Sequence, residues 1–147
     1  MTHLDSKAYG PLDIPDSRVL TLVRPILGFD DLERYALIDM HGLPGFYWFQ
    51  SVDNKNVALI VTRPDKIMEG EYIVQIHEQE DIFKDMKLIS RENLTVYLIV
   101  NVTPDPKLMT VNMMGPIIVN SATLIGAQVL STKYTDTRHP VFNNLSK

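Results

Sequence analysis

The residues best able to do chemistry in this sequence, its histidines and carboxylates, lack the spacing that a metal or catalytic site needs. His3, His41, His77 and His139 are far apart along the chain. His77 is followed by Glu78, but neighbouring side chains on a strand point to opposite faces, so the two would not share a metal ion. The chain has no cysteine, which excludes disulfides, thiol catalysis and cysteine-bound metals. We therefore expect no metal site.

Motifs for a nucleophile or a phosphate group are missing as well. No Gly-x-Ser-x-Gly motif occurs, and the stretch HGLPG at 41–45 lacks the lysine and hydroxyl residue of a phosphate-binding loop. The carboxylates at 30–31 and 78–81 lie in polar runs, whereas acid–base catalysis needs a desolvated carboxyl group with a shifted pKa. The sequence thus predicts a protein that is not an enzyme and holds no cofactor.

A polar segment near the C-terminal end, YTDTRHP at 134–140, is anchored by a tyrosine and a proline. Arg138 could present its guanidinium to a carboxylate or carbonyl group of a partner. Alternatively, Arg138 and His139 could tie the segment to backbone carbonyls of the chain itself. We favour this second, structural interpretation.

The charge of the chain argues against a nucleic-acid binder. Its 147 residues carry a net charge of −4 with a pI of about 5.5. Residues 28–96 hold most of the negative charge, with 13 Asp and Glu against 7 Lys and Arg. The apolar runs are much shorter than the roughly 20 residues that span a bilayer, and the N-terminal residues do not form a signal peptide. We expect a cytoplasmic protein with no membrane contact.

Short apolar or alternating runs, separated by Gly, Pro, Asn and Asp, predict a mainly β protein. Residues 57–62 and 94–102 are apolar on both faces, as in the middle of a sheet, whereas 72–77 alternate like a strand with one wet face. Closure into a small antiparallel β-barrel-like single domain would leave no exposed strand edges. The predicted strands are 19–23, 35–40, 46–51, 57–62, 72–77, 94–102, 116–120 and 128–132, and the predicted short helices are 29–34, 80–88 and 107–114.

This domain is expected to span residues 18–142. Residues 1–17 would form an N-terminal arm that is flexible or adds an edge strand, and residues 143–147 a C-terminal tail.

Four aromatic residues stand together in the predicted strand at 46–51. Alternation places Phe46 and Trp48 on one face and Tyr47 and Phe49 on the other. We expect Phe46 and Trp48 to face the core. The other pair would then be covered by loops of the chain or by a partner.

Four segments follow one another along nearly the whole chain, namely LGFDDLERYAL at 27–37, FYWFQSVDNKNVALIVTRP at 46–64, LTVYLIVNVTPDPKLMTVNMMGPIIVNSATLIGAQVL at 94–130 and YTDTRHP at 134–140. In this order and spacing they resemble the FliW family of flagellar assembly factors. The chain departs from the family pattern at Pro25, where a glycine is expected. The resemblance implies a small β-barrel-like protein that binds other proteins and catalyses no reaction.

The resemblance also implies two partners, flagellin and CsrA, the RNA-binding dimer that represses flagellin translation. Free flagellin would draw the protein away from CsrA, and flagellin secretion would reverse this. We expect the chain to act as a monomer without contacting nucleic acid directly.

Each implied partner suggests a set of contact residues. Flagellin ends in amphipathic helices, which need an apolar surface, and CsrA has a basic RNA-binding face, which an acidic surface would attract. The candidates for flagellin are Tyr47, Phe49, Met109, Met113 and Met114, those for CsrA are Glu69, Glu71, Glu78, Glu80 and Asp81, and Asn112 and Arg138 are further candidate contacts.

Two other classes of function stay open at this point. A nucleic-acid-binding small barrel would need a basic face with interleaved aromatic residues, whereas Lys and Arg are scattered here. An enzyme of unknown class would show a carboxylate or histidine buried in a deep pocket.

Overall fold

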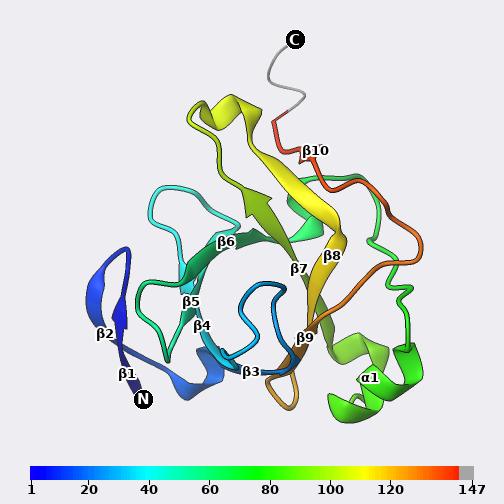
Figure 1. Ribbon diagram of the computed structural model, residues 1–147, viewed down its shortest axis with the longest axis horizontal. Helices are drawn as coiled ribbons and strands as arrows, with labels where there is room; N and C mark the ends of the chain where they lie inside the picture. The colour runs from blue at the N-terminus through cyan, green and yellow to red at the C-terminus, as the bar shows by residue number, and fades with distance from the viewer. Residues whose placement is uncertain (143–147) are drawn as a thin grey trace.

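Seven strands close into a barrel in the computed structural model, which describes residues 1–142 (Figure 1). Around the barrel the order is β8-β7-β6-β5-β4-β3-β9, and β9 pairs with β8 to close it. Every neighbouring pair is antiparallel except β3 and β9, which are parallel. The predicted barrel is confirmed. Its strands are β3 (Val19–Arg24), β4 (Arg34–Asp39), β5 (Phe46–Ser51), β6 (Ala58–Thr62), β7 (Leu94–Asn101), β8 (Thr110–Asn120) and β9 (Ile125–Gln128).

The interior of the barrel is filled by large apolar side chains from alternate positions of these strands. Tyr35 of β4 and Phe49 of β5 are both fully buried and stack with their ring centres 4.5 Å apart. Stacked aromatic rings of this size contribute more to a core than their buried area alone. The other buried members of this cluster are Leu20, Leu22, Ile26, Leu37, Val61, Ile117 and Val119.

A separate N-terminal hairpin covers part of the outside of the barrel. Its strands β1 (Thr2–Ser6) and β2 (Gly10–Ile14) pair only with each other, so they do not extend the edge of the barrel sheet as an added strand would. Leu4 and Ile14 of the hairpin pack on Ile38 of β4 and on Trp48 of β5. The hairpin is therefore an outer layer over β4 and β5.

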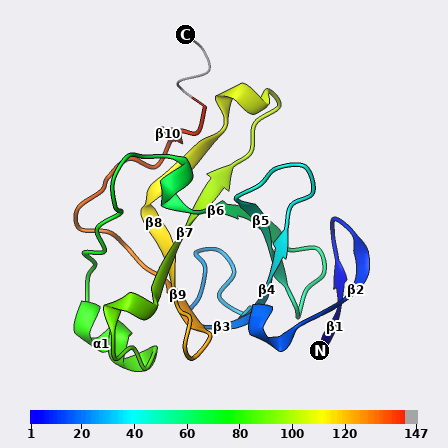
Figure 2. The same ribbon diagram turned by 180° about the vertical axis from the view of Figure 1, so that it is seen from behind.

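A second outer layer covers β7 and β8 on another side of the barrel (Figure 2). Within residues 70–77, positions 71–77 alternate between exposed and buried, and the buried Tyr72, Val74 and Ile76 pack on Val96 and Leu98 of β7 together with other outward-facing residues. One bridge, from Ile76 to Ser131, joins this segment to residues 130–134. Helix α1 (Gln79–Asp85) follows it, and β10 (His139–Pro140) pairs with the start of β8.

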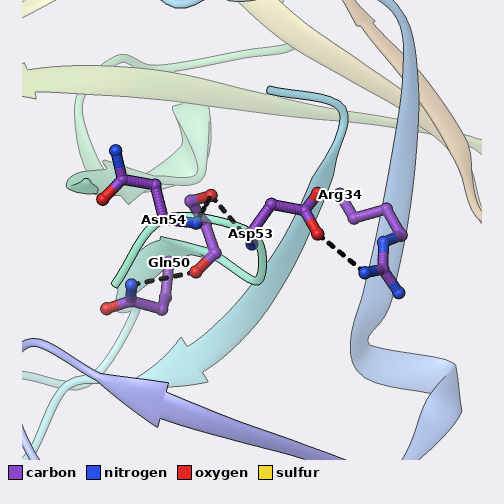
Figure 3. A network of polar contacts seen from close by, with 5 residues as sticks. Arg34, Gln50, Asp53 and Asn54 are labelled. Atoms are coloured by element: carbon purple, nitrogen blue, oxygen red, sulfur yellow. Dashed lines mark hydrogen bonds and ion pairs between the residues drawn. The ribbon is translucent and has the colours of Figure 1, made fainter. Parts of the chain in front are cut away.

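The turn between β5 and β6 is held by a network of polar contacts (Figure 3). The hydroxyl of Ser51 accepts hydrogen bonds from the backbone N–H groups of Asp53 and Asn54, and Asp53 forms an ion pair with Arg34 at 2.7 Å. The buried side chain of Gln50 donates to the Ser51 carbonyl and accepts from the Lys7 N–H at 2.8 Å. Gln50 thus connects this turn with the N-terminal hairpin.

Two of the three predicted helices are wrong. Residues 29–34 form turns that lead into β4, and the stretch predicted as a helix at 107–114 consists of a short 3₁₀ turn, Pro106–Leu108, followed by the first residues of β8. β8 needs these residues because they pair with the last residues of β7, for example Asn101 with Thr110. Only the helix predicted at 80–88 is present, as α1.

Candidate protein-binding surface

The five carboxylates predicted to attract a basic partner are all exposed. Glu69 lies just before the second outer layer and Glu71 lies at its start, Glu78 precedes α1, and Glu80 and Asp81 occupy its first turn. None of the five forms an ion pair with another residue in the described part of the chain. We call this set the acidic segment.

The acidic segment has few basic residues near it in the sequence, so its negative charge is not balanced locally. Between residues 69 and 85 there are six carboxylates and a single lysine. The sixth carboxylate, Asp85, is neutralised by Arg24 at 2.8 Å, and it lies at the far end of α1. Acidic residues in the first turn of a helix are favoured by the positive N-terminal end of its dipole, so Glu80 and Asp81 also have a local structural role.

A groove of about 510 Å³ lies between the second outer layer and the barrel. Residues 70–74 line one side of it, including the buried Tyr72 and Val74, and Leu94 and Val96 of β7 contribute apolar side chains. Charged residues line it as well, namely Arg63, Asp65, Glu71 and Arg91. An apolar surface with a few charged groups at its margins suits a ligand that has both apolar and charged parts.

The aromatic strand has the opposite orientation to the one predicted. Phe49 is 0% exposed and lies inside the barrel, so the prediction that it contacts a partner is wrong. Tyr47 is half-buried on the same inner face, where its ring meets the edge of Tyr97 at 6.1 Å. Phe46 and Trp48 face outward instead and are covered by the two outer layers.

The candidates on β8, and Met109 just before it, differ in how accessible they are. Met113 is only 4% exposed and belongs to the core between barrel and outer layer, so it cannot serve as a contact residue. The side-chain oxygen of the half-buried Asn112 accepts hydrogen bonds from the N–H groups of Met114 and Gly115. Met109 is half-buried at the margin of the same core.

Arg138 lies beside these residues because of the pairing between β10 and β8. His139 pairs with Val111, which places the neighbouring Arg138 next to Asn112. The Arg138 side chain is exposed and makes no hydrogen bond or ion pair within residues 1–142, whereas its backbone N–H donates to the carboxylate of Asp136 at 2.9 Å. The segment is tied down by backbone groups, as when the Met113 N–H donates to the Asp136 carbonyl, and not by the Arg138 side chain as we had favoured.

Burial perturbs three tyrosines in the described residues. It raises the pKa of Tyr35 and that of Tyr72 to about 12, and it also raises the pKa of Tyr97. The Tyr72 hydroxyl donates to the Met113 carbonyl at 2.6 Å, whereas the Tyr35 hydroxyl has no hydrogen-bond partner within residues 1–142. Tyr72 thus fixes the outer layer to β8.

Within residues 1–142 no group of three metal-ligating side chains lies together. The helices of that same part of the chain are too short and too polar to cross a membrane.

The groove was missed in the sequence, although one pattern pointed to it. The alternation at 72–77 predicted a strand with one wet face, and the segment is indeed buried on alternate positions. It does not join the sheet, however, and lies across the outside of the barrel. The groove forms because residues 70–74 lie beside β7, and the pattern of residues 72–77 does not indicate that position.

Comparison with known proteins agrees with the fold. A family model described as FliW protein matches residues 3–141. The chain is 31% identical over 145 residues to the flagellar assembly factor FliW of Treponema denticola, covering 98% of this chain and 96% of that protein. It is 32% identical to the FliW of Leptospira interrogans serovar Lai, covering 88% of this chain and 85% of the relative. A crystal structure of the flagellar assembly factor FliW superposes with a TM-score of 0.83 at 20% identity, covering 96% of this chain and 97% of that one. The chain belongs to the FliW family of flagellar assembly factors.

Proposed function

We propose that this protein binds flagellin and CsrA in the cytoplasm and thereby relieves the repression of flagellin synthesis by CsrA. The observation that carries the proposal is the family match, which extends over residues 3–141 and so includes nearly the whole chain. The protein acts by binding and catalyses no reaction. Flagellin and CsrA compete for it, directly or through its conformation.

The acidic segment is the proposed contact for CsrA. Its carboxylates are exposed and have no ion-pair partner among the described residues, so a basic partner can approach them without breaking an existing contact. Long-range attraction of this kind raises the association rate and weakens as salt screens it. An exposed ion pair contributes only about 0.2–1 kcal/mol, so apolar contacts must supply most of the affinity.

The proposed contact for flagellin lies where β8 and β10 meet. Met109, Asn112 and Arg138 come together there through the pairing of the two strands. The adjacent connection between β7 and β8 exposes two apolar side chains, Val102 and Leu108, each 65% exposed. These residues offer an amphipathic helix an apolar contact with a cation beside it. Tyr47 is the remaining candidate, on the half-buried inner face of β5.

The experiment is a biolayer interferometry measurement with purified CsrA and purified flagellin. We expect the triple variant Glu78→Lys/Glu80→Lys/Asp81→Lys to associate with CsrA at least about tenfold more slowly at low salt, since it reverses three steering charges. Its binding to flagellin should stay within about twofold of the unmodified protein. Leu108→Asp is the matched variant and should weaken flagellin binding alone.

Two results would contradict the proposal. If the unmodified protein bound neither flagellin nor CsrA at micromolar concentration, the family function would not apply to this chain. If the triple variant bound CsrA at the unmodified rate across a salt series, the acidic segment would not be the contact.

A further inference from the structure

We propose that the groove beside the second outer layer binds an extended peptide segment by adding it as a strand to residues 70–74. This inference goes beyond the proposed function, because it concerns the form in which a ligand binds and does not depend on which partner supplies the segment.

Residues 70–77 use one of their two edges and leave the other open. The Ile73 N–H donates to the Tyr134 hydroxyl at 3.0 Å, the Gln75 carbonyl accepts from the Thr132 N–H, and the His77 N–H donates to the Leu130 carbonyl. In extended backbone, alternate residues direct their N–H and C=O groups to the same edge. Odd-numbered residues therefore face 130–134, and the backbone groups of Tyr72 and Val74 face the opposite edge.

The backbone groups of Tyr72 and Val74 have no hydrogen-bond partner among residues 1–142. Their side chains are fixed in the core, which keeps this free edge in one position. Both residues line the groove. A free, rigid edge beside a groove is the arrangement to which extended peptides bind as an additional strand.

The floor of the groove is apolar and is not covered by another strand of the barrel. β6 pairs with β7 only through Val61 with Ile99 and Thr62 with Leu98. The first residues of β7 therefore have no strand beside them on the β6 side within the described chain. The side chains of Leu94 and Val96 line the groove at this point and can contact alternate side chains of a bound peptide.

Charged side chains flank this floor at both ends. Arg91 lies three residues before the start of β7, whereas Arg63 and Asp65 follow β6 beyond Thr62, the partner of Leu98 further along β7. All three side chains are exposed, and none of them forms an ion pair among the described residues. The Arg91 guanidinium lies over the ring of Phe83 at 5.2 Å, which holds it at the surface without neutralising its charge.

These features define one occupant. It is an extended peptide of about five residues, which matches the span of residues 70–74, with apolar side chains at alternate positions. One end carries a carboxylate, from a side chain or a C-terminus, that meets Arg91. The other end carries a positive charge that meets Asp65.

The test uses a random dodecapeptide library displayed on phage and selected on the full-length protein, so it requires neither flagellin nor CsrA. Enriched peptides are synthesised, and their affinities are measured by fluorescence polarisation. We expect them to alternate apolar residues and to carry a carboxylate near one end. Methylation of alternate backbone nitrogens should weaken binding at least about tenfold, because it removes the donors that pair with the free edge.

Protein variants provide the matched comparison. Arg91→Glu should weaken binding of the selected peptides about tenfold, and a peptide with lysine in place of its terminal carboxylate should regain affinity for this variant. Lys55→Glu, an equal charge change at an exposed site elsewhere, should leave the affinity within about twofold. Hydrogen exchange at the Tyr72 and Val74 amides should slow when peptide is bound.

Three results would each overturn the proposal: no enrichment of peptides, peptides indifferent to both Arg91→Glu and backbone methylation, or unchanged exchange at Tyr72 and Val74. Any of them could occur while CsrA and flagellin still bind, so failure here is distinct from failure of the proposed function.

Discussion

Two buried tyrosines offer a direct test of how hydrogen bonding stabilises this barrel. Tyr35 is 0% exposed and its hydroxyl has no partner in the described chain, whereas the hydroxyl of Tyr72 donates to the Met113 carbonyl at 2.6 Å. A buried polar group without a partner costs about 1–3 kcal/mol. We therefore expect Tyr35→Phe to raise the free energy of unfolding by about 1 kcal/mol. Tyr72→Phe should lower it by about 1–2 kcal/mol, because the Met113 carbonyl loses its donor.

Urea denaturation followed by the fluorescence of Trp48, the single tryptophan, measures both changes. For a domain of this size a change of 1 kcal/mol corresponds to about 2–4 °C in the melting temperature, so a thermal melt provides a second measurement. Equal m-values for the three proteins would show that the substitutions leave the unfolded state unchanged. A loss of more than 1 kcal/mol in Tyr35→Phe would refute the reasoning, since it would mean that the hydroxyl is satisfied.

The buried Tyr35 and Tyr72 also predict how the free energy of unfolding changes at alkaline pH. Burial raises the pKa of each tyrosine from an ordinary value near 10 to about 12 in the folded protein. Above pH 10 the unfolded chain loses these protons while the folded chain keeps them, so stability is complete below pH 10 and is lost as the pH rises towards 12. Each tyrosine contributes a slope on the order of 1.4 kcal/mol per pH unit. Tyr35→Phe should make the decline shallower.

Three further substitutions test how the layers are held together. Asn120→Ala should lower the free energy of unfolding by about 2 kcal/mol in urea, because the buried amide donates to the carbonyls of Met86 and Lys87 after α1. Gly126→Ala should cost about 1–3 kcal/mol in the same assay, since its Cβ would lie 2.9 Å from the Ile118 carbonyl oxygen where β9 closes the barrel. Leu4→Asp should detach the N-terminal hairpin and shift the Trp48 emission to longer wavelength, while far-ultraviolet circular dichroism of the barrel persists.

The strands could be predicted where the apolar pattern was decisive. Residues 94–102 were expected in the middle of the sheet because both faces are apolar, and β7 does pair with a strand on each side. The pattern failed in the first part of β8, which was expected to belong to a helix at 107–114 and which is followed by Pro116 within the same strand. Proline within a strand is tolerated at a bulge, and the pairing of β8 with β7 shifts register between Tyr97 and Ile99, opposite this point.

The inner and outer faces of β5 could not be told apart from its own residues. A strand that is covered on both sides carries aromatic residues on both, so alternation separates two faces without saying which is inside. The outer covering comes from distant segments, the hairpin at residues 2–14 and the layer at 70–77. Their positions depend on tertiary packing, which no local pattern in residues 46–51 records.

In the candidate site, too, features set by neighbouring residues could be predicted from the sequence, whereas features set by distant segments could not. The exposure of the acidic segment follows from its own polar sequence and could be predicted, as the structure confirms for all five carboxylates. The groove depends on residues 70–74 lying against β7, and its charged ends come from Arg91 and Asp65 on either side of that strand. Sequence alone gave no reason to bring these residues together.

We assign the attraction of a partner to the acidic segment and its retention to the groove, which are neighbouring but distinct parts of the surface. Glu71 belongs to the acidic segment and also lines the groove, so a basic protein attracted by the carboxylates, as we propose, would meet the chain beside the edge of residues 70–74. Exposed charges act mainly on the association rate, whereas a desolvated apolar floor and backbone hydrogen bonds slow dissociation. Because the free edge is held by side chains already buried in the core, ordering it on binding costs little entropy. If both proposals hold, this small barrel retains its partner through a groove only a few residues long.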